Sequence, residues 1–297
     1  YSLKIDYEIV DNTNHGKPIG VTFKGKERDE QLDAINALMP FSNGVLSATT
    51  AFGKTVTAAA LIARRKTNTL ILVHSKALLM QWHERLSEFL DIDFTEDEIS
   101  KKRGRKKAFS PVGCLDSTSN TLHGVIDIAL MQSCFENDEV KPFIKGYGMV
   151  IVDECHHVSS ITFENVLKHV TAHYVYGLTA TPIRKDGLQP IIFMQCGPIR
   201  FSADAKAQIQ KQSFQRYLVP RFTSYRPVTD DKQSFTELSQ SLAESEIRNN
   251  LIVEDVLNVV AAGRTPIILT ARTSHVELLA EMLKQHIINI IQLTGEG

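Results

Sequence analysis

Short apolar runs alternate with longer amphipathic stretches along the first two thirds of the chain. In the longer stretches, apolar residues recur at the spacing of one helix face, while the runs have the length of strands. This alternation is typical of a parallel sheet covered by helices on both faces, so the sequence predicts an α/β fold. Strands are expected at residues 44–48, 69–73, 125–130, 149–152 and 174–178, and helices at 27–38, 54–65, 75–90 and 160–169.

The same pattern divides the chain into four segments. Residues 1–25 carry turn-forming Gly and Pro between strand-like runs, which predicts an N-terminal strand extension. Residues 26–200 hold the alternating pattern of a first lobe, and residues 201–245 form an irregular connector with two prolines. Residues 246–297 are expected to open a second α/β lobe. Its predicted elements are helices at 245–262 and 275–286 and strands at 266–270 and 289–293.

Composition narrows the class of protein further. The 297 residues are 43% hydrophobic and 23% charged, which is ordinary for a globular chain of roughly two domains. No apolar run reaches the roughly 18 residues of a membrane span. None of the four cysteines forms a CxxC pair, which favours a reducing, cytoplasmic compartment, or the nucleus in a eukaryote. With a net charge of −1, any affinity for nucleic acid must be local.

The segment Ala48–Thr55, which reads ATTAFGKT, follows a predicted strand and opens a predicted helix. Backbone N–H groups at such a helix start cradle phosphates, and the helix dipole adds positive charge. Lys54 is expected to reach the β- and γ-phosphates of a nucleotide, and the Thr55 hydroxyl to ligate Mg²⁺. The alternative is a chance GKT at a helix start. The residues expected around ATP in this loop are Thr50, Ala51, Phe52, Gly53, Lys54 and Thr55.

A second signal is the strand at 149–152, which ends in the carboxylates of Asp153 and Glu154. Asp153 is expected to hold Mg²⁺, directly or through water, and Glu154 to orient and deprotonate the attacking water. With Lys54 they form the predicted catalytic set. The alternative is an acidic N-cap for the next helix. His156 belongs to a run of neighbouring cysteine and histidine residues, which could suggest a zinc site. Adjacent residues seldom converge on one ion, so His156 is expected to form a hydrogen bond within the active cleft and not to bind zinc.

A third signal follows the strand at 174–178. Thr179 and Thr181 are two residues apart, so their hydroxyls leave the strand end on the same side. The alternative is a plain turn of small residues. Two aromatic residues lie close to these motifs in the sequence. Trp82 falls in a predicted amphipathic helix, where a packing role is expected, and the role of Phe52 inside the loop stays open.

Together the three motifs resemble the Walker A, DEAD/DEAH-box and TATP motifs of superfamily 2 helicases, the second of them reading DECH here. Further segments resemble that family in the same order. They are the R-x-x-Q element at Arg28–Gln31, motif Ia at Ile71–Trp82, motif Ib at Asp127–Ser133 and motif IV at Thr265–Arg272. The subgroup that the chain resembles most contains restriction subunits and DNA excision-repair helicases.

The resemblance implies a RecA-like P-loop NTPase lobe at 26–200 and a partial RecA-like lobe at 246–297. It also implies an ATP hydrolase that uses ATP and Mg²⁺ to move along nucleic acid, with DNA favoured over RNA. By the same resemblance, Gln31 contacts adenine and Arg28 supports that pocket. His156, Thr179 and Thr181 couple the nucleotide state to the nucleic-acid groove. A nuclease or methyltransferase is expected in a partner or a further domain.

Two groups of residues are expected to contact nucleic acid. By the resemblance, strand-end residues face the sugar–phosphate backbone, namely His74, Ser75, Gln132 and Ser133, although each also suits a helix cap or a turn. The second group is a run with six basic residues in seven, which reads as a phosphate-contacting arm, a nuclear localisation signal or a solvated loop. Its basic members are Lys101, Lys102, Arg103, Arg105, Lys106 and Lys107.

The second lobe of this family supplies arginine fingers from a late motif, for which Arg264 and Arg272 come too early. The sequence is therefore expected to end before that lobe is complete, and to bind ATP with little hydrolysis on its own. One alternative function is a nucleotide-gated clamp that binds nucleic acid without unwinding it. A P-loop kinase or GTPase fits less well, because the DECH and TATP motifs are present and no N-K-x-D motif is evident.

Overall fold

A computed structural model describes residues 10–93, 110–137, 139–156, 161–180, 189–203, 217–226 and 234–294. The predicted basic arm at 101–107 and Thr181 lie outside the described residues. The chain divides into two compact units, Tyr1–Ser213 and Phe214–Gly297. Of the helices in the described ranges, none combines the length and the apolar character needed to span a bilayer.

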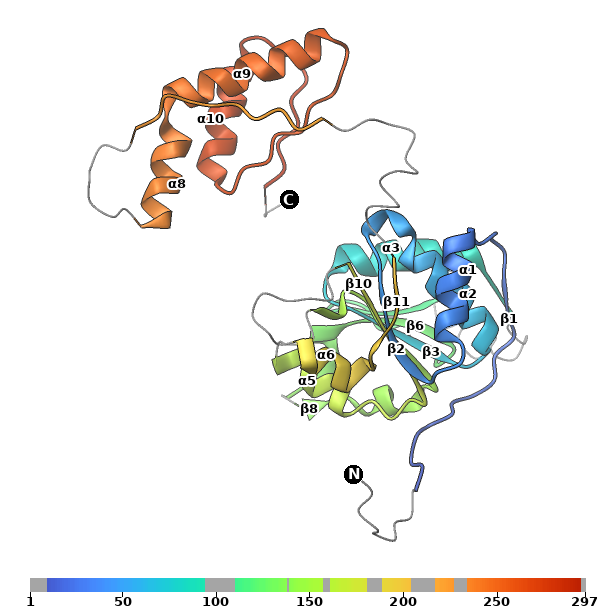
Figure 1. The fold of residues 1–297 in the computed structure, drawn as a ribbon. Helices are drawn as coiled ribbons and strands as arrows, with labels where there is room; N and C mark the ends of the chain where they lie inside the picture. Colours follow the sequence, from blue (N-terminus) through green and yellow to red (C-terminus); the bar gives the residue numbers. More distant parts are fainter. Residues whose placement is uncertain are drawn as a thin grey trace, which may run out of the picture. The chain divides into compact units, whose positions relative to one another are not determined.

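The first unit is built on a seven-stranded sheet in which every neighbouring pair of strands is parallel (Figure 1). The strand order is β11-β2-β10-β9-β3-β6-β5. In chain order these strands are β2 (Asn43–Ser47), β3 (Thr69–Val73), β5 (Gly113–Leu115), β6 (Ile126–Leu130), β9 (Met149–Val152), β10 (Tyr174–Thr179) and β11 (Ile199–Ser202). The predicted parallel α/β fold is confirmed, and each of the five predicted strands matches an observed one to within one residue at either end.

Two hydrophobic cores cover the two faces of this sheet. Side chains alternate along each strand, so Ile71 of β3 belongs to one core while Leu70 and Leu72 belong to the other. Because both faces are covered, all five residues of β3 are buried. The first core is completed by α1 (Asp29–Leu38), α2 (Lys54–Arg65) and α3 (Lys76–Phe89), and the second by α5 (Ile161–Lys168) and α6 (Gln189–Cys196).

The helices of the first unit agree with the predicted ones except for α6. Its sequence QPIIFMQC is apolar on nearly all sides, so it shows no helical period that could have predicted it. Short elements were also missed, since a strand of two or three residues shows no alternation. These are the pairs β1 (Val21–Phe23) with β4 (Leu90–Ile92) and β7 (Phe135–Glu136) with β8 (Glu139–Val140), and the 3₁₀ turns η1 (Thr50–Phe52), η2 (Met131–Cys134) and η3 (Pro142–Gly146). The two edge strands of the sheet, β5 and β11, were not predicted either.

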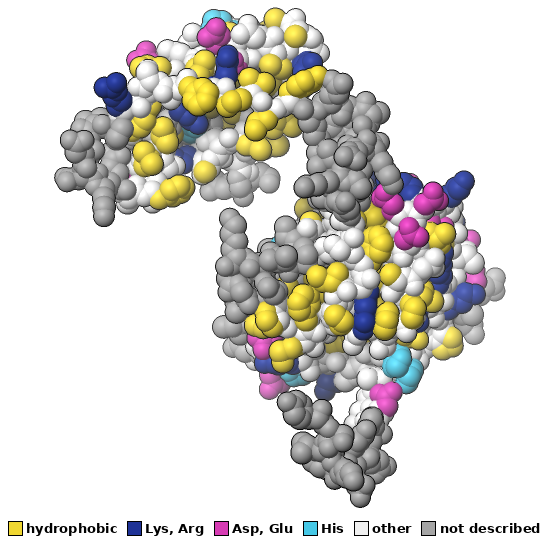
Figure 2. Space-filling model, in the orientation of Figure 1, with side chains coloured by type: hydrophobic (Ala, Val, Ile, Leu, Met, Phe, Trp, Pro, Cys, Tyr) yellow, Lys and Arg dark blue, Asp and Glu magenta, His cyan; other side chains and the backbone are white. Residues whose placement is uncertain are grey.

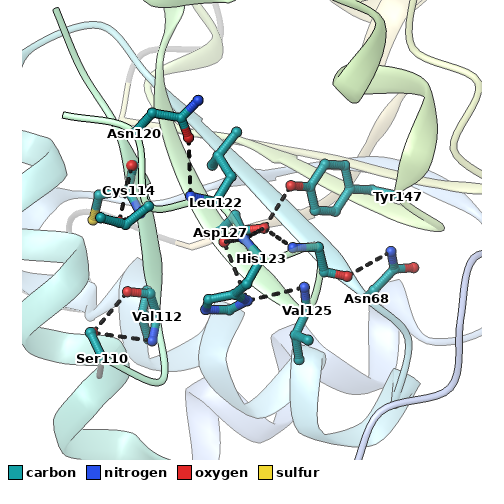
Figure 3. A network of polar contacts seen from close by, with 12 residues as sticks. Asn68, Ser110, Val112, Cys114, Asn120, Leu122, His123, Val125, Asp127 and Tyr147 are labelled. Atoms are coloured by element: carbon teal, nitrogen blue, oxygen red, sulfur yellow. Dashed lines mark hydrogen bonds and ion pairs between the residues drawn. The ribbon is translucent and has the colours of Figure 1, made fainter. Parts of the chain in front are cut away.

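Asp127, the second residue of β6, is the centre of a buried polar network near the amino edge of the sheet (Figure 3). Its carboxylate accepts hydrogen bonds from the backbone N–H of His123 at 3.1 and 3.2 Å and from that of Gly124 at 2.6 Å. The hydroxyl of Tyr147 donates to the same carboxylate at 2.6 Å. A Cβ atom on Gly113 would lie 1.9 Å from Asp127 Oδ1, so β5 can pass this carboxylate only with glycine.

The second unit contains three helices among its described residues: α8 (Phe235–Glu244), α9 (Glu246–Ala261) and α10 (Thr273–Lys284). The last two match the predicted helices at 245–262 and 275–286. Helix α8 lies in the segment predicted to be an irregular connector, and its start carries a signal that was overlooked. The hydroxyl of Ser234 accepts from the backbone N–H of Glu237 at 3.3 Å, and the Glu237 carboxylate accepts from the N–H of Ser234 at 2.9 Å. This S-x-x-E capping box predicts a helix start.

The strands predicted at 266–270 and 289–293 are wrong for this structure, in which neither segment belongs to a strand. Alternating apolar residues show only that a segment suits a sheet, whereas a strand forms by pairing with a neighbour. The described part of this unit contains no strand to pair with. Consequently Ile267, Leu269 and Ile291 are 85%, 91% and 87% exposed. Apolar side chains lie open on the visible face of this unit (Figure 2).

Candidate active site

The phosphate-loop segment connects β2 to α2 at the carboxyl edge of the sheet. After η1, Gly53 takes φ 86° and ψ 46°, a left-handed conformation that glycine adopts without strain, and α2 begins at Lys54. A Cβ atom on Gly53 would also lie 2.6 Å from Gln31 Nε2, so a larger residue would have to displace the Gln31 side chain. The first backbone N–H groups of α2 have no partner within the helix, which suits them to an anion.

The R-x-x-Q residues hold this loop in place. The side-chain amide of Gln31 donates to the backbone carbonyl of Phe52 at 2.9 Å, and the Arg28 guanidinium donates to the same carbonyl and, at 3.4 Å, to that of Ala51. Gln31 is 3% exposed. Both residues therefore brace the loop from α1, while their predicted contact with adenine stays a prediction. Phe52 is buried and packs against Phe201 with the ring centroids 6.0 Å apart, while its predicted place at the ATP site stays a prediction.

Lys54 and Glu154 meet although 100 positions separate them in the sequence. Lys54 Nζ lies 3.2 Å from Glu154 Oε1 and donates to the backbone carbonyl of Ala48 at 3.3 Å. The lysine is 7% exposed, so its charge is held in a largely dry place beside the phosphate loop. Glu154 adopts a φ of 47°, which is uncommon for a residue with a side chain and is often found at functional sites.

Asp153 follows β9 and is fixed by donors on both of its carboxylate oxygens. The backbone N–H of Glu154 donates to Oδ1 at 3.0 Å, and the indole N–H of Trp82 donates to Oδ2 at 2.7 Å. Burial raises the pKa of Asp153 above its ordinary value, and the hydrogen bond from Trp82 opposes that rise. The packing role expected for Trp82 is confirmed, since the ring is 1% exposed within the first core.

The hydrogen bond of Trp82 was not predicted, although the sequence carried a signal for it. A buried indole N–H needs an acceptor, and Trp82 lies on the helix that follows β3, next to β9 in the sheet. Which acceptor it finds depends on the register of these elements, which sequence periodicity does not give.

His156 connects the DECH segment to the TATP motif, which begins at the end of β10. Its Nδ1 atom lies 3.0 Å from the Thr179 hydroxyl and 3.3 Å from Glu154 Oε2. The backbone N–H of Ala48 donates to the carbonyl of Thr179 at 2.9 Å, so the ends of β2, β9 and β10 are joined. The predicted hydrogen bond of His156 within the cleft is thus present.

The residues predicted to contact nucleic acid follow the adjacent strands β3 and β6. Gln132 Nε2 donates to the backbone carbonyl of His74 at 3.4 Å, which brings the two segments together. Ser75 is the N-cap of α3, and its hydroxyl accepts from the N–H of Leu78 at 3.3 Å. The cap considered as an alternative for Ser75 is therefore observed. Ser133 lies half-buried within η2.

The donor set at this edge suits Mg²⁺, which prefers carboxylate and hydroxyl oxygens. Asp153 is 5% exposed and keeps acceptor capacity, because each carboxylate oxygen accepts two hydrogen bonds or metal contacts. Thr55 is the second residue of α2 and is half-buried. These two residues would hold the ion.

A parallel sheet with a glycine-lysine loop at one strand end and two acidic residues at another defines a RecA-like P-loop nucleotide-binding lobe. The chain belongs to the family described as "Type III restriction enzyme, res subunit", whose model matches residues 24–184, more than half of the chain. This places it among the superfamily 2 helicases, as the motifs predicted.

The chain is also similar to curated relatives and to a solved structure. The chain is 29% identical over 280 residues to the 161L protein of Invertebrate iridescent virus 6, which is named as a candidate helicase; the match covers 91% of this chain and 58% of that protein. It is 27% identical over 200 residues to the DNA 3'-5' translocase XPB2 of Sulfurisphaera tokodaii, covering 67% and 41%. The Pyrococcus furiosus Hef helicase domain is similar at a TM-score of 0.49 and 15% identity, covering 87% and 53%. The chain thus spans about half the length of the curated relatives that it matches.

Proposed function

We propose that this chain carries the ATP-hydrolysing lobe of a nucleic-acid translocase or helicase, with DNA as its track. The observation that carries the proposal is the convergence of Lys54, at the start of α2, with Asp153 and Glu154, which directly follow β9. Lys54 Nζ lies 3.2 Å from Glu154 Oε1, and the backbone N–H of Glu154 donates to Asp153 at 3.0 Å. Phosphate binding, metal binding and base catalysis need these three groups side by side.

In this proposal the loop between β2 and α2 receives the phosphates of ATP through its backbone N–H groups. Lys54 exchanges Glu154 for the β- and γ-phosphates, which releases the Glu154 carboxylate to orient and deprotonate the attacking water. Asp153 and Thr55 would hold Mg²⁺, which when bound would neutralise charge on the phosphates. His156 links Glu154 to Thr179, so a change at the γ-phosphate reaches the end of β10.

The track is proposed to run along the carboxyl edge past His74, Ser75, Gln132 and Ser133, with the basic run at 101–107 as a further contact. Contacts of this kind position a backbone without reading its sequence. DNA is favoured because relatives are named DNA translocases and helicases. A nuclease or methyltransferase working with this lobe is part of the same proposal.

ATP hydrolysis by the full-length protein tests the proposal. Rates should rise with single- or double-stranded DNA more than with RNA, and Glu154→Gln should lower them by about 10²- to 10⁴-fold while ATP still binds. Lys54→Ala should weaken ATP binding itself. A rate that Glu154→Gln leaves unchanged contradicts the proposal. DNA binding gated by ATP, without strand displacement or translocation, would identify a clamp instead of a motor.

A further inference from the structure

Trp82 ties α3 to the carboxylate that the proposed function assigns to Mg²⁺. Its ring is 1% exposed, and its indole N–H donates to Asp153 Oδ2 at 2.7 Å. An indole nitrogen only donates, so the bond fixes which oxygen of Asp153 faces α3. Because the acceptor is a carboxylate in a buried place, the bond belongs to the stronger, charge-assisted kind.

The second donor to Asp153 comes from a different direction. The backbone N–H of Glu154 donates to Oδ1 at 3.0 Å, so within the described ranges each oxygen has one donor, and the two bonds set the plane of the carboxylate. The remaining lone pairs are those that a metal or its water ligands would use. A carboxylate held in this way does not lose rotational freedom when it binds an ion.

We propose that Trp82 is a positioning residue, which holds the Asp153 carboxylate in the orientation that binds the Mg²⁺ of Mg·ATP. The inference rests on the proposed function, since it takes Asp153 to be the metal ligand. Groups that orient a metal ligand affect metal affinity by about 10- to 100-fold when they are removed. The predicted effect of losing the indole N–H is therefore on the Mg²⁺ requirement, more than on affinity for the nucleotide.

Calorimetry on the full-length protein measures the Mg²⁺ requirement for nucleotide binding. A non-hydrolysable ATP analogue, adenylyl imidodiphosphate, keeps catalysis out of the measurement. Trp82→Phe keeps an aromatic ring and removes the N–H. The Mg²⁺ concentration for half-maximal analogue binding should rise about 10-fold, while binding without Mg²⁺ stays within about twofold. A packing defect alone would weaken both to the same extent. We call the Mg²⁺ concentration for half-maximal analogue binding the Mg²⁺ midpoint. If Trp82→Phe leaves this midpoint unchanged, the inference is overturned.

Tyr147→Phe is a matched control, because it also removes an aromatic donor from a buried aspartate. Tyr147 donates to Asp127 at 2.6 Å near the opposite edge of the sheet (Figure 3). Its Mg²⁺ midpoint should equal that of the wild type. A rise as large as that of Trp82→Phe would show a general loss of packing and overturn the inference.

The unmodified chain gives a second measurement if Trp82→Phe does not fold. Trp82 is the only tryptophan among the 297 residues, so indole fluorescence of this sequence reports on the bond to Asp153. Emission should change when Mg²⁺ is added with the analogue, and not when the analogue is added with EDTA. Constant emission during Mg²⁺-dependent binding overturns the inference alone. Absence of any nucleotide binding overturns the proposed function and this inference with it.

Discussion

Asp127 and Asp153 are two buried aspartates of one sheet, and each accepts a hydrogen bond from an aromatic side chain. Tyr147 donates to the first at 2.6 Å and Trp82 to the second at 2.7 Å. Asp127 is 0% exposed and Asp153 is 5% exposed. By residue type and burial alone, the two sites would be judged equivalent.

The two aspartates differ in how many hydrogen bonds their carboxylates accept and in the edge of the sheet at which they lie. Asp127 also accepts from two backbone N–H groups of the turn before β6, and a ring nitrogen of His123 lies 3.5 Å away. Among the described residues, Asp153 has two donors and lies beside the ion pair of Lys54 with Glu154. A saturated carboxylate at the amino edge stabilises a turn, whereas an unsaturated one at the carboxyl edge is available to a ligand.

The largest expected difference between the two aspartates is in catalysis. Asp153→Asn removes a charged metal ligand and should lower DNA-stimulated ATP hydrolysis by more than about 100-fold, the upper effect of merely disturbing such a ligand. Asp127→Asn should leave the rate per folded molecule within about twofold. Steady-state rates of both full-length variants, normalised to the folded fraction, measure this. Equal losses would show that Asp153 has no special role.

For the free energy of unfolding we expect the opposite order, with the larger loss in Asp127→Asn. Asp127→Asn turns an acceptor for several donors into a group that itself donates, which should lower the free energy of unfolding by about 1–3 kcal/mol. Asp153→Asn places an amide NH₂ against one of two donors, but it also removes a charge that burial disfavours, so a smaller loss of about 1 kcal/mol or less is expected. Urea unfolding of the two variants gives both values. A larger loss for Asp153→Asn would make that residue a structural one.

Gly113 provides a further test of the structural role of Asp127. Its Cβ would lie 1.9 Å from Asp127 Oδ1 and 2.7 Å from the carbonyl oxygen of Thr121, so Gly113→Ala should cost about 1–3 kcal/mol through overpacking. Gly146→Ala is the control, since no atom lies within 4 Å of its added Cβ. The Mg²⁺ midpoint of analogue binding should be unchanged in both. If Gly113→Ala were as stable as Gly146→Ala, the close packing of β5 on Asp127 would be disproved.

The sequence predicted those features that depend on local order. Strand and helix periods, and motifs placed directly after strands, were sufficient for the five inner strands of the first unit's sheet and for placing Lys54, Asp153 and Glu154 beside those strands. The two edge strands, β5 and β11, were not predicted. The bond between Trp82 and Asp153 joins residues 71 positions apart, and depends on how α3 lies against the sheet. Periodicity gives a face of a helix but not its register against a strand, so this contact could not be derived.

The two errors in the second unit have opposite physical causes. Helix α8 was missed although its capping box is local, because the prolines upstream suggested an irregular connector. The strands at 266–270 and 289–293 were predicted from a local pattern, although strands depend on a partner. Local hydrogen bonds make helix starts readable from sequence, whereas sheet pairing requires knowledge of distant segments.

The smallest expected effect concerns Ser75, which could cap α3 only, or could also contact nucleic acid at the carboxyl edge of the sheet. Ser75 and Ser234 are both N-caps whose hydroxyls accept from the third residue of the helix at 3.3 Å. Each change to Ala should therefore cost about 1 kcal/mol of stability. Only Ser75→Ala removes a hydroxyl at the proposed track, where one hydrogen bond of about 1 kcal/mol corresponds to about a fivefold loss of DNA affinity. Fluorescence anisotropy at fixed salt compares the two variants. Equal DNA affinity in both, despite equal losses of stability, would make Ser75 a cap and nothing more.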